Sequence, residues 1–162
     1  MVCPKPDLET RLAEDHHQAI KLWLRLLTCT NLITAEIRTR LRENFETTLP
    51  RFDLLAQLER HPEGLRMGEL SRRMMVTTGN VTGITDQLEA EGLVRREVDP
   101  QDRRSITVKL TPEGQQIFAQ MARVHEGWVI ELFSGLSAAE KDSLHALLGK
   151  LKKYLNHKEA RA

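Results

Sequence analysis

Residues 77–110 decide the fold, and they read TTGNVTGITDQLEAEGLVRREVDPQDRRSITVKL. Either Thr77 or Thr78 offers a hydroxyl that can cap a helix, because the start of a helix leaves backbone N–H groups without partners. Apolar side chains then recur at helical spacing, at Val81, Ile84 and Leu88. Gly92 follows the last turn, where glycine easily takes a left-handed conformation. The pattern predicts an amphipathic helix that ends just before Gly92.

Two short runs of strand composition follow this helix, at residues 93–98 and 105–110. The turn between them, residues 99–104, reads DPQDRR and ends in two arginines. A helix followed by a hairpin with a basic tip is the arrangement of a winged helix. In that arrangement the helix enters the major groove of DNA, and the hairpin, or wing, reaches a neighbouring groove or the backbone. The segment therefore predicts a nucleic-acid-binding lobe.

Residues 81–114, VTGITDQLEAEGLVRREVDPQDRRSITVKLTPEG, resemble the signature region of the MarR (multiple antibiotic resistance regulator) family of bacterial transcription factors. The likeness covers a recognition helix, a Gly-Leu-Val exit, a DPxDRR wing and a Leu-Thr-Pro-x-Gly helix start, in one order and without gaps. It extends more loosely over nearly the whole chain. The resemblance implies a homodimer that binds a palindromic double-stranded DNA operator, usually as a repressor released by a small ligand or an oxidant.

The composition is compatible with such a lobe and excludes a strongly basic protein. The chain has 162 residues, with 24 basic and 23 acidic side chains and a formal net charge of +1. A DNA-binding face must therefore be a local arrangement of arginines. The sequence has no signal-like start and no run of about 18 apolar residues, so we expect a soluble, cytoplasmic protein with no membrane partner.

Long amphipathic helices are predicted on both sides of the lobe. No Pro or Gly occurs between Asp7 and about Glu43, and the apolar face of this segment is wider than one core needs. After the wing, Thr111 and Pro112 begin a helix, and the Ser-Ala-Ala-Glu sequence at 137–140 is a capping box for a last helix. Both flanking regions carry more apolar surface than one small lobe covers, so we expect them to form an all-helical dimer interface.

These patterns predict a single domain, residues 1–162, that is mainly α-helical with a small β-wing. Its winged helix-turn-helix lobe spans residues 50–110, between dimerisation helices at 7–45 and 111–157. Within the lobe, one short helix opens at Leu49 and a second covers residues 67–75. Residues 65–67 predict a short strand that pairs with the wing.

The outward polar side chains of the recognition helix are candidates for contacts with bases and phosphates. They are Thr77, Thr78, Asn80, Thr82 and Gln87. Gln87 can make a bidentate contact with adenine, whereas Thr77 is explained equally well as a helix cap. The MarR family often has arginine where this chain has Gly83 and Gln87. This difference indicates fewer phosphate contacts from the helix.

The wing carries the stronger prediction. Arg103 and Arg104 occupy the positions of the family's wing-tip arginines, so the resemblance implies that one guanidinium enters a narrow minor groove of high negative potential. We expect Asp102 to orient an arginine through a paired hydrogen bond. A charged turn alone indicates only a solvated turn, and the whole DPQDRR string favours DNA contact. Further candidate phosphate contacts are Arg72, Arg73, Arg95 and Arg96.

The resemblance also implies an effector pocket between the dimerisation helices and the DNA-binding lobe. Candidate residues carry aromatic, imidazole or guanidinium groups: His16, Trp23, Arg38, Arg42, Arg51 and Phe52. Aromatic rings beside arginines suit a phenolic or other aromatic acid, or its coenzyme A thioester. A solvated, charged helix face explains the same arginines almost as well. We expect no cofactor besides such a small-molecule effector.

Other functions fit the sequence less well. Cys29 is a candidate redox sensor, but the leucines around it favour a buried, inert thiol. His16 and His17 are adjacent on a helix and point about 100° apart, so we expect no metal site. The sequence has no phosphate loop, metal quartet or nucleophile elbow, which argues against an enzyme. A further alternative is that the winged helix binds a protein instead of DNA. Such a module would have no DNA affinity that replacement of Arg103 and Arg104 could abolish.

Overall fold

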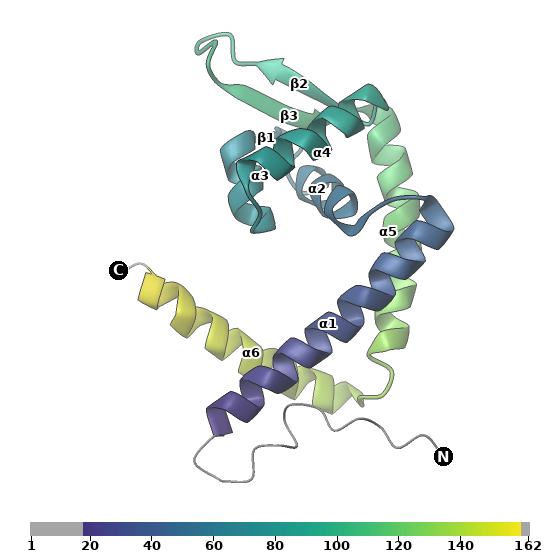
Figure 1. The fold of residues 1–162 in the computed structure, drawn as a ribbon, viewed down its shortest axis with the longest axis vertical. Helices are drawn as coiled ribbons and strands as arrows, with labels where there is room; N and C mark the ends of the chain where they lie inside the picture. Colours follow the sequence, from purple (N-terminus) through teal and green to yellow (C-terminus); the bar gives the residue numbers. More distant parts are fainter. Residues whose placement is uncertain (1–17, 160–162) are drawn as a thin grey trace. The chain divides into compact units, whose positions relative to one another are not determined.

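The computed structural model describes residues 18–159, which form six helices and three strands (Figure 1). In chain order these are α1 (Gln18–Phe45), α2 (Leu49–Glu59), β1 (Leu65–Arg66), α3 (Met67–Met74), α4 (Thr78–Ala90), β2 (Val94–Val98), β3 (Ile106–Leu110), α5 (Pro112–Leu132) and α6 (Ala138–Glu159). The chain divides into two compact units, residues 1–125 and 126–162. The predicted fold class, mainly helical with a small sheet, is confirmed.

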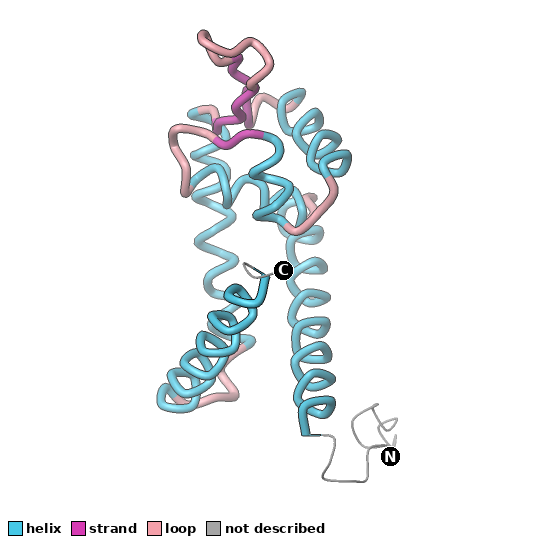
Figure 2. Tube along the Cα trace, turned by 90° about the vertical axis from the view of Figure 1, so that its left-hand side faces the viewer, coloured by secondary structure: helices cyan, strands magenta, loops and turns pink. Residues whose placement is uncertain are grey.

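The first unit contains the predicted winged helix-turn-helix, with its strands drawn in magenta in Figure 2. Strands β2 and β3 pair antiparallel from Val94 opposite Leu110 to Val98 opposite Ile106. Strand β1 pairs with the other side of β3, so that the sheet order is β1-β3-β2. This is the strand predicted at residues 65–67, and it ties the start of α3 to the wing.

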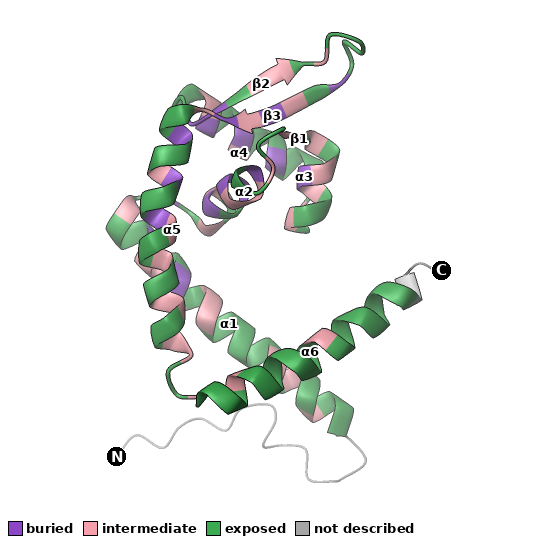
Figure 3. Ribbon diagram, turned by 180° about the vertical axis from the view of Figure 1, so that it is seen from behind, coloured by how far each residue is buried: buried purple, intermediate pink, exposed green. Residues whose placement is uncertain are grey.

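A core of small and medium apolar side chains holds α2, α3, α4 and the sheet together (purple in Figure 3). Its most buried members, all at most 2% exposed, are Leu41, Leu54, Leu55, Leu58, Leu70, Val81, Leu88, Val94 and Val108. Thr85 is also fully buried, because its hydroxyl donates to the Val81 carbonyl at 2.7 Å within α4. The sequence pattern did not predict this polar core position.

Hydroxyl side chains cap four of the described helices. Thr48 and Thr77 accept the backbone N–H groups of residues 51 and 80, at 3.4 Å in each case. Thr111 caps α5 by accepting the Gly114 N–H at 2.9 Å. At the start of α6, the Glu140 N–H donates to the Ser137 hydroxyl at 3.3 Å, and Glu140 accepts the Ser137 N–H at 2.8 Å. The predicted capping box is therefore present.

Two helix ends differ slightly from their predicted positions. Helix α1 continues to Phe45, beyond Glu43, and Glu46 ends it with a left-handed φ of 51°. Helix α3 stops at Met74, because Met75 takes a left-handed φ of 54°. The spacing of apolar residues does not show where a single residue takes a left-handed conformation and ends a helix.

The wing joins α5 through a close backbone contact. The Thr111 N–H donates to the Leu93 carbonyl at 3.1 Å, and the Thr111 hydroxyl donates to the Gly92 carbonyl at 2.6 Å. A Cβ atom at Gly114 would lie 1.9 Å from the Leu93 carbonyl oxygen, far inside van der Waals contact. Only glycine fits there, so the Leu-Thr-Pro-x-Gly sequence has a direct physical explanation.

Large apolar side chains remain exposed on the long helices. On α1 of the first unit they are Ile20, Leu22, Trp23, Leu27 and Leu32. In the second unit they are Ile130 of α5 and Leu144, Leu147, Leu148, Leu151, Tyr154 and Leu155 of α6. No residue of α6 whose side chain is described is buried. None of the helices in residues 18–159 is long and apolar enough to cross a membrane.

Candidate nucleic-acid interface

The first half of α4 presents short polar side chains to solvent. Thr77, Thr78, Asn80 and Thr82 are all exposed. The Thr77 hydroxyl caps the helix, and the Thr82 hydroxyl donates to the Thr78 carbonyl at 2.9 Å. Gln87 is exposed further along the helix. Because Val81 and Leu88 are fully buried, they fix which face of α4 carries these polar groups.

Arg96, a predicted phosphate contact, is used inside the protein instead. Its guanidinium forms ion pairs with Asp86 and Glu89 of α4, and its backbone N–H donates to Glu89 at 2.9 Å. Burial opposes the charge, but hydrogen bonds to the two carboxylates outweigh it and raise the pKa of the guanidinium. We name Asp86, Glu89 and Arg96 the α4–β2 lock. Because these two acids face Arg96, a phosphate has to compete with them for its guanidinium, and its assignment as a phosphate contact stays a prediction.

The tip of the wing is ordered by its own backbone. The Asp99 N–H donates to the Ser105 carbonyl at 2.9 Å, and the Ser105 N–H donates to the Asp102 carbonyl at 2.8 Å. The Asp102 carboxylate accepts the Arg104 N–H at 3.0 Å. The expected pairing of Asp102 with a guanidinium is therefore replaced by a contact with the backbone, since the turn brings that N–H closer.

Arg103 and Arg104 are left exposed by this turn. Within residues 18–159 neither guanidinium lies in an ion pair with a carboxylate. Two adjacent unpaired guanidinium groups on an ordered turn present a concentrated positive charge. The wing tip therefore concentrates positive charge locally, as a DNA-binding face has to in a chain whose net charge is only +1.

Below the tip, Arg95 belongs to a charged row across the wing. Its guanidinium lies 2.8 Å from Glu97, which also receives a 2.7 Å ion pair from Lys109. Lys109, with a smaller contribution from Arg95, holds the pKa of the Glu97 carboxyl below its usual range. Arg95 is 57% exposed, so a phosphate has to compete with Glu97 for it.

Arg72 and Arg73 lie in the last turn of α3 and are exposed. Together with Glu69 of the same helix they line a shallow cavity of about 310 Å³. The two guanidinium groups outnumber the single carboxylate there. Their assignment as phosphate contacts stays a prediction.

The predicted effector residues that the structure describes lie in different surroundings. Phe52 is 5% exposed and packs in the core, with its ring centroid 5.4 Å from Phe118 and 4.7 Å from His125. Arg51 forms an ion pair with Glu91. Trp23, Arg38 and Arg42 are exposed on α1, and His16 lies outside the described residues. Phe52 is therefore a core residue, because α5 supplies two rings that cover it.

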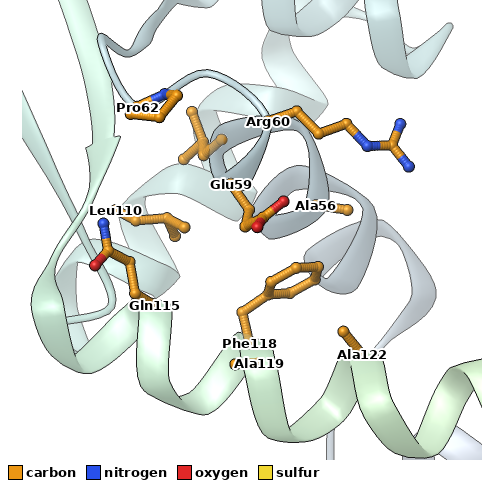
Figure 4. Close-up of a pocket in the computed structure, with 10 residues that line it drawn as sticks. Ala56, Glu59, Arg60, Pro62, Leu110, Gln115, Phe118, Ala119 and Ala122 are labelled. Atoms are coloured by element: carbon orange, nitrogen blue, oxygen red, sulfur yellow. The ribbon is translucent and has the colours of Figure 1, made fainter.

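A different cavity, of about 550 Å³, lies between α2, the end of β3 and α5 (Figure 4). It is lined by Ala56, Leu58, Glu59, Arg60, Pro62, Leu110, Gln115, Phe118, Ala119 and Ala122. Burial lowers the pKa of the His125 imidazole, whose ring is tilted against the Phe52 ring with the centroids 4.7 Å apart. Sequence reasoning missed this cavity because alanines create space without any chemical signature. Ala119 and Ala122, one helical turn apart, were the available signal.

Two further predictions concern cysteine and metal. Cys29 is exposed on α1 rather than buried, since the leucines near it in sequence do not cover it. Among residues 18–159, no group of three or more His, Cys, Asp or Glu side chains is placed to hold a metal ion. His17, like His16, lies outside the described residues.

The chain is similar to known transcriptional regulators in sequence. The MarR family profile matches residues 47–106. The regulator YkoM of Bacillus subtilis, described as an uncharacterised HTH-type transcriptional regulator, is 36% identical over 85 residues, which is 52% of this chain and 55% of YkoM. The chain thus spans about half the length of that curated relative.

Solved structures extend the similarity to almost the whole chain. A MarR family transcriptional regulator from Silicibacter pomeroyi is 31% identical and has a TM-score of 0.74, over 88% of this chain and 99% of the other. A mutant MarR from E. coli, complexed with operator DNA, is 26% identical with a TM-score of 0.74, over 86% of this chain and 99% of the other. The fold, the family profile and these similarities agree: the chain belongs to the MarR family of winged helix-turn-helix transcriptional regulators.

Proposed function

We propose that this protein is a homodimeric DNA-binding regulator that occupies a palindromic operator and represses a small set of genes until a small ligand releases it. The observation that carries the proposal is the wing tip, where Arg103 and Arg104 are exposed and unpaired within the described chain on a turn ordered by its own hydrogen bonds. An ordered turn loses little entropy on binding, so its charges are ready for a narrow minor groove.

The polar face of α4 is the second element of the proposed interface. Thr78, Asn80, Thr82 and Gln87 are short or planar polar side chains that can bond phosphates and base edges. The E. coli MarR mutant with a similar fold was solved with operator DNA, which supports DNA as the partner of this surface. Thr77 serves as the helix cap, and Arg72, Arg73 and Arg95 add phosphate contacts around it.

Dimerisation is proposed to use the long helices, with 7–45 and 111–157 as dimerisation segments and 50–110 as the DNA-binding lobe. The apolar side chains of α6 recur at positions 144, 147, 148, 151, 154 and 155, which lie on one helical face. An exposed apolar stripe of this length is costly in water and is typical of a helix that packs against another subunit.

The ligand that releases the protein from DNA is proposed to be a small aromatic acid. The 550 Å³ cavity beside Phe118 has the size of a small-molecule site, an aromatic wall and one guanidinium, from Arg60. The Glu59 carboxylate repels any second anionic group in the cavity, such as the phosphates of coenzyme A. We therefore favour a free monocarboxylate over a coenzyme A thioester as the ligand. Trp23, Arg38 and Arg42 on the exposed face of α1 are the remaining candidates from the sequence.

The proposal is tested by fluorescence anisotropy with the DNA immediately upstream of the protein's own gene. We expect tight binding that resists excess nonspecific DNA, and loss of that binding in the Arg103→Gln, Arg104→Gln double variant with the dimer intact. Addition of a panel of aromatic acids should then weaken binding of the wild type. Wild-type binding that competitor DNA removes completely would contradict the regulator proposal and would favour a protein-binding winged helix.

A second candidate release mechanism is oxidation of Cys29, which is exposed in the single chain and lies within the proposed dimerisation segment 7–45. An accessible thiol can be oxidised, whereas a buried one is protected. Treatment with hydrogen peroxide should release DNA from the wild type and not from the Cys29→Ser variant if oxidation is the signal. Equal responses of the two proteins would exclude Cys29 as the sensor.

A further inference from the structure

Helix α4 carries no basic side chain. Its residues, from Thr78 to Ala90, read TGNVTGITDQLEA and include neither lysine nor arginine. Arginine and lysine make the commonest specific contact with guanine, through the O6 and N7 atoms of its major-groove edge. The acids Asp86 and Glu89 both form ion pairs with Arg96, which weakens their repulsion of a phosphate. The composition of α4 therefore excludes the usual contact with guanine and favours recognition of A·T pairs.

The Thr82 side chain offers a methyl group to an external partner. Thr82 is exposed, and its hydroxyl donates to the Thr78 carbonyl at 2.9 Å within the helix. Because the hydroxyl is turned to its own backbone, the methyl group is left for an outside contact. A threonine methyl group can pack against the C5-methyl group of thymine, which lies in the major groove. Asn80 and Gln87, on the other flank of the exposed face, carry amides that suit the N6 and N7 atoms of adenine.

The middle of this exposed face has no side chains. Gly79 and Gly83 lie one helical turn apart, opposite the side where Val81 and Leu88 are buried in the core. An added Cβ atom at either glycine would meet nothing within 4 Å, and neither glycine has a positive φ. Packing and backbone conformation therefore do not require glycine, which destabilises a helix relative to alanine. The property that glycine adds here is a close approach of the helix backbone to a partner.

We propose that α4 reads A·T base pairs and that Thr82 selects a thymine through its methyl group. Gly79 and Gly83 let the helix backbone approach the bases, which brings the short Thr82 side chain within reach of the C5-methyl group. This contact rests on the proposed function, because the thymine belongs to an operator. The MarR family often has arginine at the position of Gly83, so the close approach is a property of this chain.

Uracil-containing DNA tests the contact, because uracil differs from thymine only by the missing C5-methyl group. The DNA upstream of the protein's own gene is copied once with thymine and once with uracil, and both fragments are titrated by fluorescence anisotropy. We expect the wild type to bind the uracil fragment about tenfold to twentyfold more weakly. Loss of one buried methyl contact weakens binding about fourfold, and a dimer makes the contact in two half-sites. Random DNA should bind equally well with either base, since nonspecific binding uses the phosphates.

Two substitutions at position 82 separate the methyl group from the hydroxyl. Thr82→Ser removes the methyl group, so this variant should bind the thymine fragment about tenfold to twentyfold more weakly and should no longer distinguish thymine from uracil. Thr82→Val keeps a methyl group in nearly the same shape, so it should keep the preference for thymine. Both variants should melt within about 2 °C of the wild type, because Thr82 is exposed. A valine variant that loses the preference while the serine variant keeps it would overturn the proposal, because the hydroxyl would then make the contact.

Gly83→Ala tests the close approach separately from folding. Alanine favours the helix, so the melting temperature should rise, while the added methyl group holds the helix away from the bases. We expect weaker binding to the thymine fragment and unchanged binding to random DNA. A Gly83→Ala protein that is more stable and binds the thymine fragment as tightly as the wild type would contradict the close approach.

The same titrations separate the methyl contact from the proposed function. If the wild type binds the thymine and uracil fragments with equal affinity that competitor DNA does not remove, the methyl contact is refuted and the regulator proposal stands. If the wild type binds neither fragment more tightly than random DNA, the regulator proposal is refuted, and the methyl contact with it.

Discussion

Replacement of Arg96 by methionine separates a structural role from a DNA contact. Arg96 is 24% exposed on its side chain and joins β2 to α4 through Asp86 and Glu89. Methionine keeps most of the aliphatic stem but removes both ion pairs. Partly exposed ion pairs contribute about 0.5–1 kcal/mol each, so we expect the variant to lose about 1–2 kcal/mol of unfolding free energy. The backbone hydrogen bond from Arg96 to Glu89 is kept.

Urea unfolding at one fixed protein concentration measures this loss. A double-mutant cycle with Glu89→Gln should return a coupling energy of about 0.5–1 kcal/mol, since the two groups are in direct contact. Arg95→Met is the matched control: the Arg95 side chain is 57% exposed and, among residues 18–159, forms an ion pair with Glu97 alone, so its replacement should cost less than about 0.5 kcal/mol.

The salt dependence of DNA binding then decides between the two roles. The salt slope is the steepness with which the logarithm of the binding constant falls with the logarithm of the salt concentration, and removal of one arginine that contacts a phosphate lowers it by about 0.9. Because the α4–β2 lock already engages Arg96, we expect the slope of Arg96→Met to equal that of the wild type. A slope reduced by about one, with unchanged stability, would refute the structural role of the lock.

Three further predictions concern the wing junction, the half-buried His125 and the dimer. Gly114→Ala should destabilise the protein by about 3 kcal/mol or more, because the added Cβ atom meets the Leu93 carbonyl oxygen. Gly83→Ala, in open space on α4, should stabilise it by about 0.5–1 kcal/mol. Thermal melts compare the two variants, and equal effects would contradict the contact at Gly114. Burial lowers the pKa of His125, so the unfolded state takes up the proton at a higher pH than the folded state, and stability should fall as the pH drops below about 6.5. In His125→Phe, the urea midpoint should depend less on pH between about pH 7.5 and 5. An unchanged pH dependence of the midpoint would exclude His125 as its source. Leu147→Arg should shift the sedimentation coefficient toward the monomer, because Leu147 is 66% exposed on the apolar stripe of α6, and an unchanged dimer would place the interface elsewhere.

The order of helices and strands was predictable because periodicity and capping residues carry that information locally. The hydroxyl at Thr77, the glycine at position 92 and the Ser-Ala-Ala-Glu box act within one helical turn, and each does what its sequence predicts. The left-handed Met75 and the buried Thr85 were not predicted. Neither has a local signature, since one depends on a tight turn and the other on packing.

The exposure of the wing-tip arginines was predictable, because Arg103 and Arg104 lie in a short polar turn. Their role as DNA contacts rests on the DPQDRR string and stays a prediction. The ion pairs of Arg96 were not predicted because its partners, Asp86 and Glu89, lie on a different element, and a sequence does not show which charges meet. The ring contacts of Phe52 were not predicted for the same reason, since Phe118 and His125 are more than sixty residues away in the chain.

Hydroxyl-radical footprinting on the upstream DNA tests the central claim most directly, namely that a dimer holds an operator with α4 and the wing. We expect the wild type to protect two symmetric half-sites separated by one helical turn of DNA, about 10–10.5 base pairs, or a multiple of it. The Arg103→Gln, Arg104→Gln variant, at concentrations that restore binding, should lose protection only at the outer minor grooves. A single protected site, or a footprint that the wing variant leaves unchanged, would contradict the account.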